Sequence, residues 1–147
     1  VDMAAMSRLM EAAGDTPVTF HRAFDHTNNP FKALEDIISL GCVRILTSGC
    51  RPTALEGAEL LSRLVEKAGE RIIIMPGCGV RENNIAEIAR LSGAREFHFS
   101  ARESVESGMI FRREGIPMGI PGFDEWHIKQ TGQNIIEAAV SALKSPI

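Results

Sequence analysis

The chain has 147 residues, of which 44% are hydrophobic and 24% are charged, and its formal net charge is −3. This composition is typical of a globular protein, and without a Lys/Arg cluster longer than Arg112-Arg113 it argues against nucleic-acid binding. No apolar run approaches the ~18 residues that a membrane span requires, and no secretory leader pattern opens the sequence. We therefore expect no membrane association and a cytoplasmic location, which the three cysteines, too few for a disulfide framework, also suit.

The first part of the chain predicts a strand between two helices. Apolar residues recur at helical spacing from Met3 to Ala13, and Gly14 then ends that helix. Residues 18–24 are β-branched and aromatic, which predicts a strand. After a loop of turn-forming residues, Pro30 opens a second helix, which ends at Gly41.

The same strand–helix unit then recurs. Residues 43–47, 71–75 and 96–100 predict three more strands, with helices expected over 55–68, 85–93 and 136–143. Strand centres recur about every 26 residues, and strict alternation at this spacing predicts an α/β fold with parallel strands joined by right-handed crossovers.

Two architectures fit this order of elements, a doubly wound open sheet and part of a (βα)₈ TIM barrel. The regular spacing favours the barrel, of which the chain would hold the last four βα units preceded by one helix. A whole barrel needs at least about 200 residues. We therefore expect residues 1–147 to form a single domain that is the C-terminal part of a barrel. Either further residues precede it or two copies close the sheet as a homo-oligomer.

Glycines and prolines interrupt every period between residues 103 and 132. The segment 103–132 is therefore predicted to be a long irregular loop, a feature that in compact domains is usually functional or disordered. Its apolar residues, Trp126 among them, favour an ordered cover over the strand ends. A segment without fixed structure is the alternative.

Polar residues near the carboxyl ends of the strands are the candidate catalytic groups, because parallel α/β folds bind ligands at that edge. His21 on the first strand and His98 on the last are predicted to point into the barrel interior. The two histidines would transfer protons, Arg22 would bind an anion through its guanidinium, and Asp25 would supply a carboxylate. The alternatives are hydrogen-bonded core histidines and an ion pair that only orders the loop.

Small residues follow each of the last three predicted strands, where backbone amides and a following helix can hold an anion. This pattern predicts a site for a phosphorylated or carboxylated metabolite formed by Ser48, Gly49, Gly77, Gly79, Ser100 and Arg102. The alternative is that the glycines only form tight turns.

Two cysteines follow successive strands at the same predicted edge. Cys50 and Cys78 could face each other there and bind a soft ion such as Cu(I) or Zn(II). Two inert thiols are the alternative. Cys42, at the opposite end of the strands, is expected to be a small buried hydrophobic residue.

Four motifs together resemble the copper homeostasis protein CutC family: PVTFHRAFD over residues 17–25, RILTSG over 44–49, IMPGCGV over 74–80 and EFHFSAR over 96–102. They follow one another in the family's order, and the likeness extends from about residue 1 to residue 113. The resemblance implies a TIM barrel, a cytosolic location, self-association and the handling of Cu(I). The family's shared strand-end residues fall on the same positions that we select above, from His21 to Ser100.

Two functions are therefore considered. The first is a cytosolic copper homeostasis protein that binds Cu(I) through thiolates. The alternative is a barrel enzyme or sensor for a small anionic metabolite. Copper handling would depend on Cys50 and Cys78, whereas enzymatic action would depend on His21 or Arg22.

Overall fold

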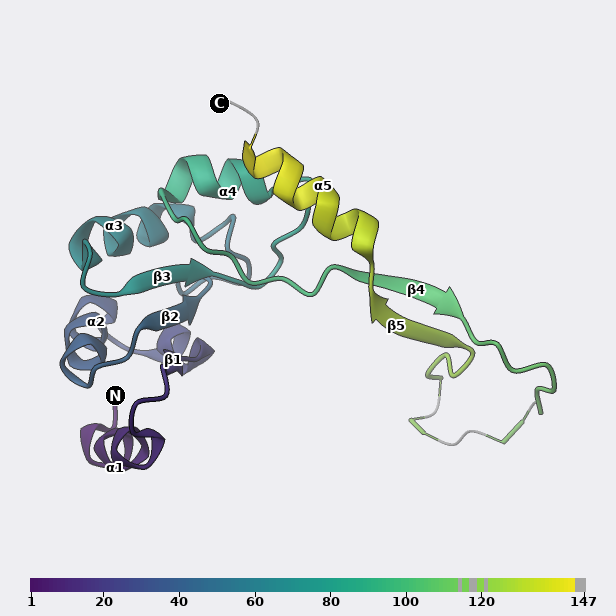
Figure 1. Cartoon of the computed structure of the whole chain (residues 1–147), viewed down its shortest axis with the longest axis horizontal. Helices are drawn as coiled ribbons and strands as arrows, with labels where there is room; N and C mark the ends of the chain where they lie inside the picture. The colour runs from purple at the N-terminus through teal and green to yellow at the C-terminus, as the bar shows by residue number, and fades with distance from the viewer. Residues whose placement is uncertain (114, 117–118, 121, 145–147) are drawn as a thin grey trace.

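The computed structural model describes residues 1–113, 115–116, 119–120 and 122–144. In chain order its elements are α1 (Met3–Ala13), β1 (Thr19–Phe20), the 3₁₀ helix η1 (Arg22–His26), α2 (Pro30–Ser39), β2 (Arg44–Thr47), α3 (Ala58–Ala68), β3 (Ile73–Pro76), α4 (Ile85–Ser92), β4 (Arg102–Glu106), β5 (His127–Thr131) and α5 (Gln133–Lys144). Figure 1 shows the sheet of β1, β2 and β3 with helices packed beside it, and the β4–β5 hairpin that projects away from this sheet.

The central sheet is parallel, with strand order β1-β2-β3. Thr19 aligns with Arg44, and Arg44 aligns with Ile73, so the three strands start at the same edge. The helices that connect them, α2 and α3, lie between successive strands in the sequence. This alternation confirms the predicted α/β class with a parallel sheet.

The predicted fourth strand is reduced to a single parallel bridge between Gly77 and His98. His98 donates its backbone N–H to the carbonyl of Pro76 at 2.9 Å, so the segment lies beside β3 in the expected direction. The ladder stops there because the backbone at Ala101 has a left-handed φ of 46°, which turns the chain towards β4.

The predicted first strand is also shorter than expected, because only Thr19 and Phe20 pair with β2. His21 adopts an extended backbone and becomes the N-cap of η1, where its Nδ1 accepts a hydrogen bond from the Ala23 N–H at 3.2 Å. The prediction of a strand over residues 18–24 was wrong beyond Phe20 since the polar end of the run forms this helical turn.

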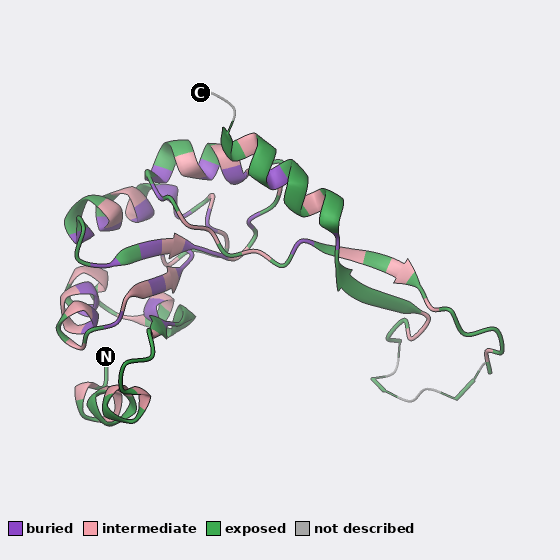
Figure 2. Cartoon of the chain, viewed as in Figure 1, coloured by how far each residue is buried: buried purple, intermediate pink, exposed green. Residues whose placement is uncertain are grey.

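The core lies between the sheet and the helices that follow its strands, where Figure 2 shows most of the buried residues. Ile45 and Ile74 are buried on the helix-covered face, together with Leu34, Leu61 and Ile88 from the helices. Side chains alternate across a strand. Arg44, Leu46, Ile73 and Met75 therefore occupy the other face, where they are half-buried or exposed.

The segment 103–132 differs from the irregular loop that the sequence predicts. β4 and β5 pair antiparallel at its two ends, with Val105 opposite Ile128. Figure 1 shows this hairpin extending away from the central sheet rather than covering the strand ends. Residues 114, 117–118 and 121 lie outside the described residues. The strands form because the glycine and proline residues of the segment, apart from Gly132 after β5, fall between them and leave both β stretches uninterrupted.

A search of the described residues for a membrane-spanning helix finds none with the required length and apolarity.

Candidate functional site

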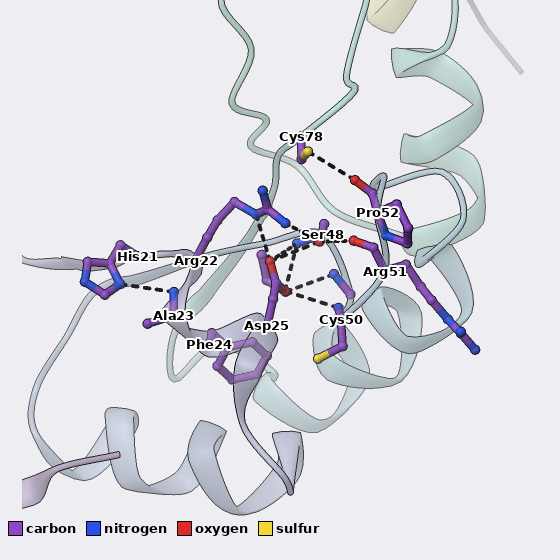
Figure 3. Close-up of polar contacts among 12 residues, drawn as sticks. His21, Arg22, Ala23, Phe24, Asp25, Ser48, Cys50, Arg51, Pro52 and Cys78 are labelled. Atoms are coloured by element: carbon purple, nitrogen blue, oxygen red, sulfur yellow. Dashed lines mark hydrogen bonds and ion pairs between the residues drawn. The ribbon is translucent and has the colours of Figure 1, made fainter.

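The carboxylate of Asp25 joins η1 to the loop that follows β2. Its side chain is only 5% exposed. Oδ1 accepts hydrogen bonds from the Thr47 hydroxyl at 2.5 Å and from the backbone N–H groups of Ser48 and Cys50, both at 3.1 Å. Oδ2 accepts from Arg22 Nε at 2.8 Å (Figure 3). We call Arg22, Asp25, Thr47, Ser48 and Cys50 the Asp25 cluster.

Opposing effects set the charge of Asp25. Burial by itself raises the pKa of this carboxyl, but the hydrogen bonds from Thr47, Arg22 and the backbone of Ser48 and Cys50 lower it more, so the net pKa lies below the usual aspartate value. Asp25 is therefore an ionised carboxylate whose two oxygens are both occupied by donors. This arrangement suits an anchor for two loops better than a general base.

Arg22 is the solvent-facing member of the Asp25 cluster, with 42% of its side chain exposed. Its Nη2 donates to the Ser48 hydroxyl at 3.0 Å, while Nε is held by Asp25. The hydrogen bond to Asp25 raises the pKa of the guanidinium further, so Arg22 stays charged. The cluster thus fixes one oriented cation at the carboxyl end of the sheet.

Three of the six predicted anion-binding residues are buried: Ser48, Gly49 and Gly77. Ser48 is engaged by the Asp25 cluster. A Cβ on Gly49 would lie 2.4 Å from the Gly57 carbonyl oxygen, and one on Gly77 would lie 2.5 Å from a Leu46 methyl. Close packing against backbone therefore requires glycine at position 49, whereas at position 77 the leucine side chain could move aside.

The other three predicted anion-binding residues, Gly79, Ser100 and Arg102, line one pocket of about 300 Å³. Arg81 lines it too and was missed by the sequence reasoning, although its place two residues after Gly79 in the same loop could have indicated it. Another pocket, of about 450 Å³, lies at the other end of β3 and is lined by residues from Val65 to Glu96. No predicted site residue lines it.

The two candidate catalytic histidines are not brought to the Asp25 cluster. Figure 3 shows the His21 ring turned away from the Asp25 carboxylate, with Nδ1 engaged by Ala23. His98 is exposed and lies against Gly77 at the end of β3. Among the described residues, no hydrogen bond joins either imidazole to Arg22 or Asp25. The inward direction predicted for His21 is therefore wrong, because the chain leaves β1 at Phe20 and His21 becomes the N-cap of η1. Phe97 and Phe99, on either side of His98, pack against the core, so the inward direction of His98 stays a prediction.

Cys50 and Cys78 follow β2 and β3 as predicted, and both are free thiols that lie in the left-handed backbone region, with φ of 56° and 76°. The Cys78 thiol donates to the Pro52 carbonyl at 3.2 Å. Figure 3 shows the Cys50 sulfur on the far side of the Asp25 carboxylate, turned away from Cys78. The two thiols therefore do not form a preformed pair of ligands.

The surroundings of the thiols add no further ligands. Burial raises the pKa of the Cys50 thiol, and the charge of Asp25 raises it again, so this group is protonated at neutral pH. Within the described ranges, no three His, Cys, Asp or Glu side chains are grouped so that they could hold a metal ion. A closed copper centre is therefore not built into this arrangement.

The comparisons with known proteins agree with the resemblance seen in the motifs. Residues 1–103 match the model of the CutC family. A CutC family protein of Chromobacterium violaceum is 50% identical over 97% of this chain and 58% of its own length. The human protein named copper homeostasis protein cutC homolog is 48% identical over 81% of this chain and 44% of its own length.

The crystal structure of the CutC protein from Streptococcus agalactiae superposes with a TM-score of 0.64. It is 32% identical in sequence, and the match covers 67% of this chain and 49% of that one. The chain thus spans about half the length of the relatives that it matches.

Proposed function

Because this chain belongs to the CutC family, we propose that it serves copper homeostasis by binding Cu(I) in the cytoplasm. The name of the human relative supports the link to copper. The cysteine thiols support Cu(I) as the oxidation state of the bound copper, since thiolates are soft ligands and Cu(I) prefers soft ligands.

The observation that carries the proposal is the position of two free thiols at the carboxyl edge of the sheet. Cys50 and Cys78 follow adjacent parallel strands, and both adjoin the loop 50–54. The Cys78 carbonyl accepts from the Ala54 N–H at 2.9 Å, and its thiol donates to Pro52. Both side chains are half-buried, so a small ion can reach them from solvent.

The arrangement of these thiols indicates which kind of copper binding to expect. They face apart and have no third ligand among the described residues. We therefore propose that each thiolate binds Cu(I) as cargo by itself, and that the ion exchanges readily. Such binding suits transfer of copper between partners rather than its storage.

The test is a titration of the fully reduced chain with Cu(I) under anaerobic conditions, followed by the charge-transfer absorption of the Cu(I)–thiolate bond. Binding should be partly lost in Cys50→Ser and in Cys78→Ser and abolished in the double variant. Cys42→Ala is the matched control, because this buried thiol lies at the opposite end of the strands. It should bind Cu(I) as the unaltered chain does.

Two outcomes would contradict the proposal. Absence of any Cu(I)–thiolate absorption in the unaltered chain would remove copper binding as its function. Undiminished absorption in the double serine variant would show that the ion is held elsewhere.

We also propose that residues 1–147 form one domain that is part of a (βα)₈ barrel, and that copies of the chain associate. The parallel order β1-β2-β3 with its connecting helices supports the barrel. The half-exposed face of the sheet opposite these helices supports association, because that face is apolar in part.

A further inference from the structure

A second site lies at the same edge of the sheet, outside the Asp25 cluster. It is the pocket of about 300 Å³ between the loop after β3 and the segment that leads into β4. Its lining residues are Gly79, Val80, Arg81, Glu82, Phe99, Ser100, Ala101, Arg102 and Ile135. None of them belongs to the Asp25 cluster and none is a cysteine, so the pocket is independent of the proposed copper site.

Positive charge dominates this pocket. Arg81 belongs to one wall and Arg102 to the other, and Glu82 is the one carboxylate among the lining residues. Both arginines are exposed, and among the described residues neither guanidinium has an acceptor. Two such arginines in the lining of one small pocket favour an oxyanion, because the paired N–H donors of a guanidinium match the oxygens of a phosphate group.

Hydrogen bonds already hold both walls in place. Asn84 fixes the first wall, since it accepts from the Arg81 N–H at 2.8 Å and donates to the Gly79 carbonyl at 2.9 Å. The second wall is fixed where the Gly132 N–H donates to the Ala101 carbonyl at 2.8 Å. A ligand would therefore meet a pocket whose backbone needs little further ordering.

We propose that this pocket binds the phosphate group of a small phosphorylated molecule. Arg81 and Arg102 neutralise the phosphate, and the exposed hydroxyl of Ser100 donates to it. The half-buried side chains of Phe99 and Ile135 contact the rest of the ligand. The loops after two successive parallel strands are a frequent place for phosphate in α/β barrels.

The test uses inorganic phosphate as the probe and the unaltered chain labelled for NMR. Phosphate should shift the amide signals of residues 79–82 and 100–102 in a saturable manner. Arg81→Gln and Arg102→Gln should each weaken binding about tenfold, the loss expected for a hydrogen bond to a charged group. Arg90→Gln is the matched control, because this exposed arginine of α4 does not line the pocket and should leave binding unchanged.

Succinate, at equal ionic strength, distinguishes phosphate from carboxylate ligands. Weaker binding of succinate is expected, and equal binding would overturn the phosphate assignment. Unshifted amides in the unaltered chain, or undiminished binding by the Arg81→Gln/Arg102→Gln variant, would overturn the site itself. The amide shifts do not depend on the folding of any variant. Cu(I) binding by this double variant should be unchanged, so each proposal can fail without the other.

Discussion

Asp25 is the residue on which the carboxyl edge of the sheet depends. It accepts hydrogen bonds from Arg22, Thr47 and the backbone of the loop after β2, and thereby holds the left-handed backbone of Cys50 in place. A left-handed φ costs an L residue about 1–2 kcal/mol. The Asp25 carboxylate offsets part of this cost, so the position of a proposed copper ligand depends on a residue that need not touch copper.

Replacement of Asp25 by Asn is expected to destabilise the chain by about 2–3 kcal/mol at pH 7, because the amide cannot accept the donors that converge on both oxygens. The folded-state pKa of Asp25 is lowered, so its contribution is complete above the usual aspartate pKa of about 4 and is lost as the pH falls through the lower folded-state value. Urea unfolding of both chains at pH 7 and at pH 3 should show the difference narrowing in acid.

The control for this prediction is Asp15→Asn, since Asp15 is exposed. It should unfold as the unaltered chain does at both pH values. Equal stability of Asp25→Asn and Asp15→Asn at pH 7 would show that the carboxylate is not an anchor.

At the scale of elements, a close approach between two glycines joins β2 to α3. Gly57 is the N-cap of α3, and Gly49 lies in the loop after β2. A Cβ on Gly57 would lie 1.9 Å from the Ser48 carbonyl oxygen, although the φ of Gly57, −89°, suits any residue. The glycine is therefore required for space and not for its backbone freedom.

Gly57→Ala is expected to destabilise the chain by about 2 kcal/mol, because the added methyl group forces α3 away from the loop that carries Ser48 and Cys50. Gly108→Ala is the matched control, since nothing lies within 4 Å of its Cβ position. It should change the free energy of unfolding by less than about 0.5 kcal/mol. Similar urea midpoints for the two variants would refute the role of the close approach.

At the scale of the whole molecule, the sheet has one covered and one open face. Ile73 is 37% exposed on the open face, although it lies beside the central strand β2. Of the described strands, β1 pairs only with β2, so its outer edge offers unpaired backbone groups. Open sheet edges and apolar sheet faces both favour association with further strands.

We therefore expect light scattering to give a mass above the 16.0 kDa of one chain. Ile73→Glu should lower this mass, because it places a charge on the open face. Leu9→Glu is the control, since Leu9 is 62% exposed on α1, a helix without buried residues. A mass of one chain at every concentration would refute association.

Much of the fold could be predicted from local pattern. The apolar spacing from Met3 to Ala13 gave the bounds of α1, and alternation of strands and helices gave the parallel sheet. The ends of strands were less predictable. Residues after Phe20 form η1 because Asp25 reaches across to Thr47, a contact between residues 22 positions apart that no local pattern contains.

The candidate site, like the fold, could be predicted only in part from the sequence. The sequence by itself determined which residues reach the carboxyl edge, because strand direction and loop position follow from periodicity and from the family motifs. Only the tertiary structure decided which of them meet there. It joined Asp25 to Arg22, Thr47 and Ser48 by hydrogen bonds. It also placed Arg81, Ser100 and Arg102 around one pocket, and it turned the thiols of Cys50 and Cys78 apart. The reason is physical: order along the chain fixes the edge that a residue reaches, but packing between loops fixes its neighbours and the direction of its side chain.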